Sequence, residues 1–418
     1  MATETNQPTV GIVGLGSVGL PLAILFARAS APLVLIERDL ERRTAIARGR
    51  SPLAHLRDEQ IEELHDAVVS DDARDLARCA AVIICVPTPL DAERRPDLSA
   101  VEEAAGEVAA HVAEGALVVL ESTTWPGTTR EVLGRIFGTV EVDLAYSPER
   151  VDPGRDEAGR LGRDVPKLVG GLSPAGTERA AALYSRAFET VVPVSSTEVA
   201  EAAKLVENVY RAVNIALVGE LKVAFDAMGI DVWEVLDAAA TKPFGFTRFD
   251  PGPGMGGHCL PIDPFYLAWA AKRAGAGARF VELSGEINRA MPSFVASKVR
   301  VALRSRGIEV EGAQVLILGV AYKAGVGIVE ESPAFPIASE LGHEGAQVRY
   351  HDPLVPLCDL GESLPLGPEQ LAESDVVVLL VAQPGMDLSL LVESEVLVVD
   401  TRAALRGELN GQPRYFPA

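Results

Sequence analysis

The sequence predicts an α/β protein with two Rossmann-like, doubly wound domains that are joined by a long central helix and a helical middle domain. Short apolar runs alternate with longer amphipathic stretches at both ends of the chain, and a long helical pattern separates these two regions. A chain of 418 residues also exceeds the size at which one core stops growing, about 250 to 300 residues. We therefore expect domains at residues 1–195, 196–297 and 298–418.

The expected strands are short, mostly apolar runs. Their length, and the helix-length amphipathic segments between them, are typical of parallel strands with helices on both faces of the sheet. In the first domain these runs are residues 10–13, 33–36, 81–86 and 117–120, and in the last domain they are residues 315–318, 348–350, 376–381 and 396–399.

The middle of the chain has a different pattern. Residues 196–228 repeat apolar side chains at helical spacing, interrupted only by Gly219, and Gly229 provides a stop signal. This pattern predicts one long helix or two consecutive helices. Residues 251–264 are rich in glycine and proline and are too irregular for a helix or a strand, so we expect a loop there.

Composition excludes several classes of function. The formal net charge of -21 and the pI near 4.8 argue against a nucleic-acid partner, which requires a basic face. The four cysteines show no paired spacing for a metal site, and a chain of this size needs no disulfide framework. No apolar run reaches the roughly 20 residues of a membrane span, and the N-terminus lacks the pattern of a signal peptide. We expect a cytoplasmic protein with no metal and no membrane partner.

A cofactor motif follows the first expected strand. The chain continues there with Gly14-Leu15-Gly16-Ser17-Val18-Gly19 and then enters a helical pattern. In this context the first glycine permits a tight turn, the second lets a pyrophosphate approach the backbone, and the third permits close packing of helix and strand. The motif predicts a dinucleotide site.

The end of the second strand selects the cofactor. Glu37 lies near the expected spacing of about 20 residues from the motif, where a carboxylate accepts both ribose hydroxyls and repels a 2′-phosphate. NAD is therefore the expected cofactor. The neighbouring Arg38 leaves NADP open, and the alternative interpretation of Glu37 is a solvated strand end.

A reactive cysteine is predicted in the glycine-rich loop. Cys259 follows Gly256, Gly257 and His258, so a thiolate there has exposed amides and space for a ligand beside it. The alternative is a buried, inert cysteine, which is our expectation for the cysteines at 79 and 85. His258 is adjacent in sequence and is expected to contact a ligand or pack in the loop, because neighbouring side chains seldom face each other.

Lys204 and Asn208 are four residues apart on the expected long helix and so share one face. A lysine beside an amide can stabilise an alkoxide or polarise a hydroxyl group. The alternative is a solvated helix surface.

Six segments occur in order along nearly the whole chain: residues 11–19, Val86-Pro87-Thr88-Pro89, Ser122-Thr123-Thr124, Ser147-Pro148-Glu149-Arg150, residues 204–214 and residues 254–264. In these segments the sequence resembles the UDP-glucose/GDP-mannose dehydrogenase family. Residues 241–246, which read Thr-Lys-Pro-Phe-Gly-Phe, look most like its UDP-N-acetylglucosamine 6-dehydrogenase branch. The resemblance implies NAD-dependent, four-electron oxidation of the C6 primary alcohol of a nucleotide sugar to the uronic acid, with a UDP-N-acetylhexosamine or UDP-hexose as substrate.

The resemblance also implies catalytic roles. Cys259 would capture the aldehyde as a thiohemiacetal, which is then oxidised to a thioester, and Lys204 and Asn208 would stabilise the oxyanion. Such a covalent intermediate retains the aldehyde between two hydride transfers, so two NAD are consumed per product. Water ordering and proton transfer are implied for Asp263 and Thr123, and the base for thioester hydrolysis is implied to be Glu149.

Binding residues are implied in the same way. The family further implies a homodimer or larger homo-oligomer that pairs through the central helix, and a role in polysaccharide or secondary-metabolite biosynthesis. The nicotinamide side of NAD would be lined by Val86, Pro87 and Thr88, and Ser122 would also bind the cofactor. The nucleotide sugar would contact Glu149, Arg150, Lys204, Asn208, Arg211, Gly256, Gly257 and His258, and Tyr322, Lys323 and Arg402 would hold its diphosphate.

The sequence departs from the family in two places. The family usually has D-x-x-D-x-R-E-S-P where residues 325–333 here read Gly-Val-Gly-Ile-Val-Glu-Glu-Ser-Pro, so Glu330 replaces a cation. At contact distance this charge reversal is worth several kcal/mol at an effective dielectric constant near 20. It either changes the preferred nucleotide sugar or affects only the order of a loop. Gly219 also replaces a common asparagine, at a cost of roughly 1 kcal/mol relative to alanine in a helix.

Other functions stay open on sequence grounds. The same chemistry on an unusual nucleotide or nucleotide sugar in a specialised pathway is one. A two-electron NAD-dependent dehydrogenase of the 6-phosphogluconate type is another, and a non-catalytic nucleotide binder is the third.

Overall fold

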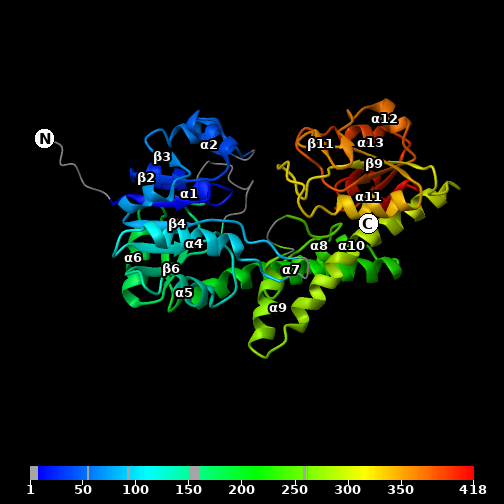
Figure 1. The fold of residues 1–418 in the computed structure, drawn as a ribbon. Coiled ribbons are helices and arrows are strands. Elements are labelled where there is room, and N and C mark those ends of the chain that lie inside the picture. The colour runs from blue at the N-terminus through cyan, green and yellow to red at the C-terminus, as the bar shows by residue number, and fades with distance from the viewer. Residues whose placement is uncertain (1–7, 54–55, 92–94, 151–160, 258–259, 261) are drawn as a thin grey trace. The chain divides into compact units, whose positions relative to one another are not determined.

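The computed structural model describes residues 8–53, 56–91, 95–150, 161–257, 260 and 262–418. The chain forms two compact units (Figure 1). The first comprises Met1–Glu207 with Phe265–Gly277, and the second comprises Asn208–Pro264 with Ala278–Ala418. Each unit is described by itself.

The first unit is built on an eight-stranded sheet with the order β3-β2-β1-β4-β5-β6-β7-β8. All neighbouring strands are parallel except β6 and β7, which pair antiparallel. The central strands are buried on both faces, as their continuous apolar sequences require. The strands are β1 (Val10–Val13), β2 (Leu33–Ile36), β3 (Val68–Ser70), β4 (Ala81–Ile84), β5 (Leu117–Leu120), β6 (Asp143–Tyr146), β7 (Lys167–Gly171) and β8 (Val191–Pro193).

Helices in this unit pack against the sheet through aromatic and aliphatic side chains. Phe26 of α1 and Tyr184 of α6 are fully buried in one cluster, with ring centroids 6.0 Å apart. The helical elements are α1 (Gly19–Arg28), α2 (Leu40–Ala47), α3 (Asp58–Glu62), η1 (Ala73–Arg78), α4 (Ser99–His111), η2 (Thr129–Leu133), α5 (Gly134–Ile136) and α6 (Pro174–Tyr184).

Helix α7 (Thr197–Ala227) is a single helix of 31 residues, and the division between the two units falls within it. Gly229 follows with a φ of 70°, a left-handed conformation that ends the helix at low steric cost. The sequence pattern therefore predicted this helix and its stop correctly. A shorter helix, α9 (Asp263–Arg273), begins at the end of the glycine-rich loop.

The second unit contains a five-stranded parallel sheet with the order β10-β9-β13-β14-β15. Side chains of β13 alternate between two buried clusters, so helices cover both faces of this sheet. Its strands are β9 (Gln314–Leu318), β10 (Gln347–His351), β13 (Val376–Leu379), β14 (Leu397–Asp400) and β15 (Tyr415–Pro417), with a separate pair β11 (Leu357–Cys358) and β12 (Gly361–Glu362). Its helices are α8 (Val232–Ala240), α10 (Arg279–Ser305), α11 (Ala334–His343), α12 (Pro368–Ala372), α13 (Ser389–Glu393) and α14 (Arg406–Leu409).

The predicted fold class is confirmed, with differences in detail. Residues 85–86 and 380–381 lie beyond the ends of β4 and β13, because the chain turns there into loops at the carboxyl edge of each sheet. Gly219 has a packing role that the sequence did not reveal: a Cβ there would lie 3.1 Å from the Met291 sulfur, so glycine lets α10 approach α7 closely. The domain boundaries at 195 and 297 stay predictions. No helix in the described part of the chain is long and apolar enough to cross a membrane.

Candidate active site

The three glycines of the cofactor motif differ in their surroundings as the sequence motif predicts. Gly14 has a φ of 90°, and a Cβ there would lie 2.6 Å from the carbonyl oxygen of Cys85. A Cβ on Gly19 would lie 1.9 Å from the carbonyl oxygen of Gly14, so this contact excludes every other residue type. A Cβ on Gly16 would meet no atom within 4 Å. The open space at Gly16 is where a ligand can approach the backbone.

The first turn of α1 is available for an anion. It contains no acidic residue, and Val18, the residue before the helix, makes no side-chain cap. Ser17 is exposed next to it. Free amides at a helix N-terminus attract a pyrophosphate, so these residues fit the dinucleotide that the motif predicts.

Glu37 is buried and lies beside the glycine motif. Its carboxylate accepts hydrogen bonds from the amides of Leu15 and Asp39, each 3.0 Å, and pairs with Arg42 at 3.0 Å. Burial raises the pKa of Glu37, but the amide hydrogen bonds and Arg42 outweigh it and hold the pKa below its usual value. Glu37 is therefore not a solvated strand end. An ionised carboxylate at this position can accept ribose hydroxyls.

Arg38 points to a different partner. Its guanidinium pairs with Glu103 at 2.6 Å and with Glu107 at 2.8 Å, both on α4. These carboxylates raise the pKa of Arg38, and their negative charges compensate the positive charge of the guanidinium. A 2′-phosphate would have to compete with both of them, which favours NAD over NADP.

The loop after β4 is held from two sides. The Ser122 hydroxyl donates to the carbonyl of Val86 at 2.7 Å. The Tyr266 hydroxyl donates to the carbonyl of Thr88 at 3.0 Å. Thr88 is buried, whereas Pro87 is exposed. The structure thus brings together Val86, Thr88 and Ser122, three of the residues predicted to bind the cofactor.

The Ser147–Arg150 loop follows β6. The amide of Arg150 donates to Glu149 Oε1 at 2.7 Å, and the Arg150 side chain pairs with Glu207 of α7 at 2.7 Å. The side chain of Glu149 is only 20% exposed. Thr123, the other predicted proton-transfer residue of this unit, is half-buried after β5.

Lys204 and Asn208 lie one turn apart on α7, and both side chains are buried, at 9% and 6% exposure. The alternative of a solvated surface is therefore wrong for this pair. Within the second unit, the Asn208 amide donates to Asp263, which is 2% exposed. Two predicted catalytic residues thus contact each other. Arg211 is exposed on the same helix.

The glycine-rich loop packs against the segment after β9. The amide of Gly257 donates to the carbonyl of Glu330 at 3.0 Å. A Cβ on Gly256 would lie 2.6 Å from the Cβ of Tyr322, so only glycine permits this approach. Lys323 lies above the Tyr322 ring, 5.4 Å from its centroid. The predicted substrate residues Gly256, Gly257, Tyr322 and Lys323 are therefore neighbours, whereas His258 and Cys259 lie outside the described residues.

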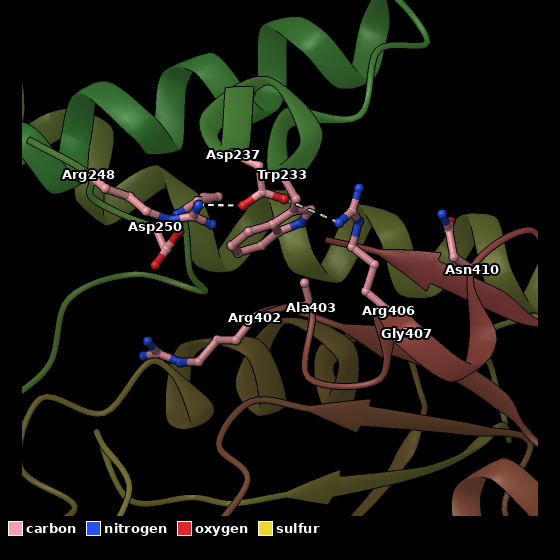
Figure 2. A pocket seen from close by; sticks show the side chains of 10 residues that line it. Trp233, Asp237, Arg248, Asp250, Arg402, Ala403, Arg406, Gly407 and Asn410 are labelled. Carbon is pink, nitrogen blue, oxygen red and sulfur yellow. Dashed lines mark hydrogen bonds and ion pairs between the residues drawn. The ribbon is translucent and has the colours of Figure 1, made fainter. Parts of the chain in front are cut away.

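Arg402 lines a cavity of about 650 Å³ within the second unit (Figure 2). Its Nε donates to the carbonyl of Leu380 at 3.1 Å, and its guanidinium passes beside Gly252. The other two arginines of the cavity are paired: Arg406 with Asp231 at 2.7 Å, and Arg248 with Asp250 at 2.8 Å. Arg402 is the arginine whose guanidinium has no ion pair with a described carboxylate. It can therefore offer its charge to a diphosphate.

Comparisons with known proteins match both units of the chain. Three family models match in chain order: the UDP-glucose/GDP-mannose dehydrogenase family NAD binding domain at residues 8–188, the central domain at residues 198–290 and the UDP binding domain at residues 316–407. The UDP-N-acetyl-D-glucosamine 6-dehydrogenase of Pseudomonas aeruginosa is 33% identical over 89% of this chain and 90% of its own length.

The chain belongs to the UDP-glucose/GDP-mannose dehydrogenase family.

Solved structures agree with this membership. The UDP-D-ManNAc dehydrogenase of Pyrococcus horikoshii superimposes with a TM-score of 0.84 at 31% identity, covering 94% of this chain and 95% of that one. The NDP-N-acetyl-D-galactosaminuronic acid dehydrogenase of Methanosarcina mazei Go1 gives 0.81 at 28% identity, over 98% and 94%. This family member is an oxidoreductase of the nucleotide-sugar dehydrogenase class, and NAD is its cofactor. These comparisons favour a nucleotide-sugar dehydrogenase over the two alternatives of a 6-phosphogluconate-type enzyme and a non-catalytic binder.

Sequence reasoning missed several residues that hold this site. Tyr266 fixes the loop after β4, and Lys167 and Glu121 form a buried ion pair beside the Ser147–Arg150 loop. Their partners are between 19 and 178 residues away in the chain. No local pattern marks such contacts, and a lysine or a glutamate is ordinarily expected at the surface.

Proposed function

We propose that this dehydrogenase oxidises the C6 primary alcohol of a UDP-N-acetylhexosamine, or of a UDP-hexose, to the carboxylate through a covalent intermediate on Cys259. The observation that most supports this is the buried contact of Asn208 with Asp263, four residues beyond Cys259. Buried amide and carboxylate groups are usually hydrogen-bonded in folded proteins, and both members of this pair are predicted catalytic residues. Relatives named as UDP-N-acetyl-D-glucosamine and UDP-N-acetyl-D-mannosamine dehydrogenases support the substrate class.

The first half of the proposed reaction forms the carbon–sulfur bond. NAD, held by the glycine motif and Glu37, would accept the hydride of each oxidation. Lys204 and Asn208 would stabilise the oxygen at C6 as the alcohol passes its proton to a water molecule ordered by Asp263 and Thr123. The Cys259 thiolate then adds to the aldehyde carbon, and the same cation and amide hold the resulting oxyanion. The second oxidation leaves a thioester.

The second half releases the acid. Glu149 takes a proton from a water molecule, and the water oxygen adds to the thioester carbonyl. The carbon–sulfur bond then breaks, the thiolate returns to Cys259, and the carboxylic acid leaves as the carboxylate. Asp263 and Thr123 would order the water. This assignment uses the part of Glu149 that is exposed, since most of its side chain is buried.

We infer that the nucleotide diphosphate binds in the second unit. Lys323 and Arg402 provide two cations, and Tyr322 packs on the glycine-rich loop. An arginine fork matches the geometry of a phosphate, and a lysine adds a point charge. The cavity at Arg402 therefore supports a site for the phosphate-bearing part of the substrate.

We also propose a homodimer that pairs through α7. Val199, Val206, Tyr210 and Leu217 are all exposed, between 44% and 57%, and their spacing of seven, four and seven residues places them on one helix face. An exposed apolar stripe of this kind is a protein contact surface. Light scattering should give twice the monomer mass, and Val206→Glu should reduce it to the monomer mass. A monomeric wild type would contradict the dimer.

The reaction is tested by counting NADH. The protein is incubated with NAD and each of UDP-N-acetylglucosamine, UDP-glucose, GDP-mannose and TDP-glucose, and NADH is compared with sugar consumed. We expect two NADH per UDP-sugar and a uronic acid product. Turnover only with a different nucleotide would identify the unusual substrate that residues 325–330 allow.

Two cysteine variants separate the covalent mechanism from its rival. Cys259→Ala should lose turnover, whereas the control Cys358→Ala, at a partly buried cysteine of β11, should keep it. A single NADH per sugar, with full activity in Cys259→Ala, would establish a two-electron dehydrogenase instead.

A further inference from the structure

A buried charged network lies under the Ser147–Arg150 loop. Lys167, the first residue of β7, places its ammonium 2.9 Å from Glu121 Oε2, and the Tyr184 hydroxyl donates to Glu121 Oε1 at 2.5 Å. The side chains of Lys167 and Glu121 are 3% and 0% exposed, and Tyr184 is fully buried. The start of β7, the end of α6 and the residue that follows β5 thus share one set of hydrogen bonds.

Lys167 also contacts the loop directly. Its ammonium donates to the carbonyl of Pro148 at 3.1 Å and lies 3.8 Å from Glu149 Oε2. Neighbours of Lys167 add two further links to the same loop. The Ser147 hydroxyl donates to the carbonyl of Leu168 at 2.8 Å, and Arg150 donates to the carbonyl of Pro166 at 2.6 Å. The start of β7 therefore supports the loop along its whole length.

The charges of the network keep Lys167 cationic. Burial lowers the pKa of the Lys167 ammonium, but Glu121 and Glu149 outweigh burial and raise the pKa above its ordinary value. Burial also raises the pKa of Glu121, and Lys167 and Tyr184 oppose this rise. Two carboxylates thus share one ammonium. Glu121 is enclosed, whereas Glu149 is the member with an exposed part.

A network of this kind is a poor device for stability alone. Removing two charges from water costs about as much as their attraction returns, so apolar residues of similar size would pack these segments together equally well. The contacts of Lys167 to Pro148 and Glu149 have no counterpart in such an apolar core. These contacts indicate that the Lys167 ammonium serves to hold the Ser147–Arg150 loop.

We propose that Lys167 is a positioning residue for Glu149. It fixes the Glu149 carboxylate in the orientation in which the carboxylate accepts a proton from the attacking water during thioester hydrolysis. The proposal rests on the proposed function of Glu149. Glu121 and Tyr184 hold the ammonium in place, and the ammonium holds both the main chain and the carboxylate of the loop. A rigid cation beside a carboxylate restricts its rotamers and preserves the orientation in which it accepts a proton from water.

The test is a double-mutant cycle on hydrolysis. Lys167→Met, Glu149→Gln and the combined variant are mixed with NAD and the UDP-sugar on which the wild type is most active. Each variant should give a rapid burst that approaches two NADH per subunit, followed by slow steady turnover. For Lys167→Met the steady turnover should be about 100-fold slower than that of the wild type. Mass spectrometry should find the sugar adduct on the protein. Because Lys167 acts through Glu149, the combined variant should be no slower than Glu149→Gln.

Controls separate positioning from general damage. Lys222→Met removes another buried lysine, which donates to the Pro417 carbonyl at 3.0 Å and to Asp226 at 3.4 Å. It should produce no adduct. If Lys167→Met does not fold, Glu121→Gln combined with Lys167→Met removes both buried charges together and restores a neutral core.

The proposal would be overturned by an unchanged steady rate in Lys167→Met, or by equal losses of burst and steady rate with no adduct. Multiplying losses in the combined variant would likewise assign Lys167 a structural role only. Failure of the proposed function looks different, because the wild type would then produce one NADH per sugar and Glu149→Gln would form no adduct.

Discussion

Glu201 couples the stability of the first unit to pH. Its side chain is fully buried on α7 and accepts hydrogen bonds from the Gly127 amide at 2.6 Å and from the Thr129 amide and hydroxyl at 2.9 and 2.7 Å. Burial raises the pKa of Glu201 to about 7, although these three donors lower it. The carboxyl therefore caps the N-terminal end of η2 at the cost of a buried charge.

The size of the effect follows from the two pKa values. The folded protein holds the Glu201 proton more tightly than the unfolded chain, so its contribution to stability is fully present below pH 4.5 and is lost as the pH rises through about 7. At about 1.4 kcal/mol per pH unit, the rise of the Glu201 pKa from 4.5 to about 7 costs the folded state about 3 kcal/mol at high pH. Most of this loss, roughly 2 to 3 kcal/mol, falls between pH 5 and pH 8.

The assay compares Glu201→Gln with wild type by urea unfolding at several pH values. Glutamine mimics the protonated acid at every pH, so the stability of the variant relative to wild type should increase by roughly 2 to 3 kcal/mol from pH 5 to pH 8. In a Trp233→Phe background the fluorescence reports Trp125 and Trp269, whose ring centroids are 4.6 Å apart in the first unit. Glu178→Gln, at a surface position of α6, is the control and should show no slope.

The opposite slope would refute this reasoning. If the three donors outweigh burial, the folded protein favours the ionised carboxylate, and Glu201→Gln should then lose stability relative to wild type as the pH rises. If the difference in stability between Glu201→Gln and wild type did not change with pH, the Glu201 carboxyl would be open to water.

Three further predictions concern the binding sites. Gly19→Ala should cost more than about 2 kcal/mol of stability because its Cβ would lie 1.9 Å from the Gly14 carbonyl oxygen, whereas Gly16→Ala should unfold like wild type in thermal melts and yet bind NAD at least about tenfold more weakly. Equal NAD affinity in Gly16→Ala would contradict a pyrophosphate site there. Tyr266→Phe loses one hydrogen bond of about 1 kcal/mol, so the KM for NAD should rise by about fivefold with little change in the KM for the sugar. Glu330→Arg should lower the KM for the UDP-sugar severalfold at low salt and less at high salt, and a KM that does not respond would assign residue 330 no role in recognition.

The sequence predicted the parts of the fold that depend on local pattern. Apolar runs located β1, β2 and β5 to the residue, and the helical period located α7, because burial on both faces or on one stripe leaves a visible repeat. The strands β3, β6, β7 and β8 escaped prediction. They are short, partly exposed or mixed in composition, as in β7, whose first residue is the buried lysine.

In the candidate site, too, the sequence predicted the features that depend on a local motif and missed the contacts between distant segments. Gly14, Gly16 and Gly19 have the surroundings that their motif predicts, since one short segment of chain makes the turn, the opening and the close contact. Contacts between distant segments could not be derived from the sequence. Asn208 with Asp263 and Lys167 with Glu121 each join residues about 50 positions apart, and only the folded chain brings them together.

The altered stretch after β9 keeps its contacts with the glycine-rich loop although the charges usual in the family are missing. Gly257 is held by the carbonyl of Glu330, and the Tyr322 amide donates to the carbonyl of Ile328 at 3.0 Å, so both links use main-chain atoms that any residue provides. The side chain with a structural role here is Ser332, whose hydroxyl is buried and hydrogen-bonded, and this serine belongs to the part of the motif that the sequence retains. Because Glu330 itself is exposed, its side chain can change without disturbing the loop. A change of charge at residue 330 should therefore leave these main-chain contacts intact, so Glu330→Arg tests the choice of nucleotide sugar separately from the fold of this stretch.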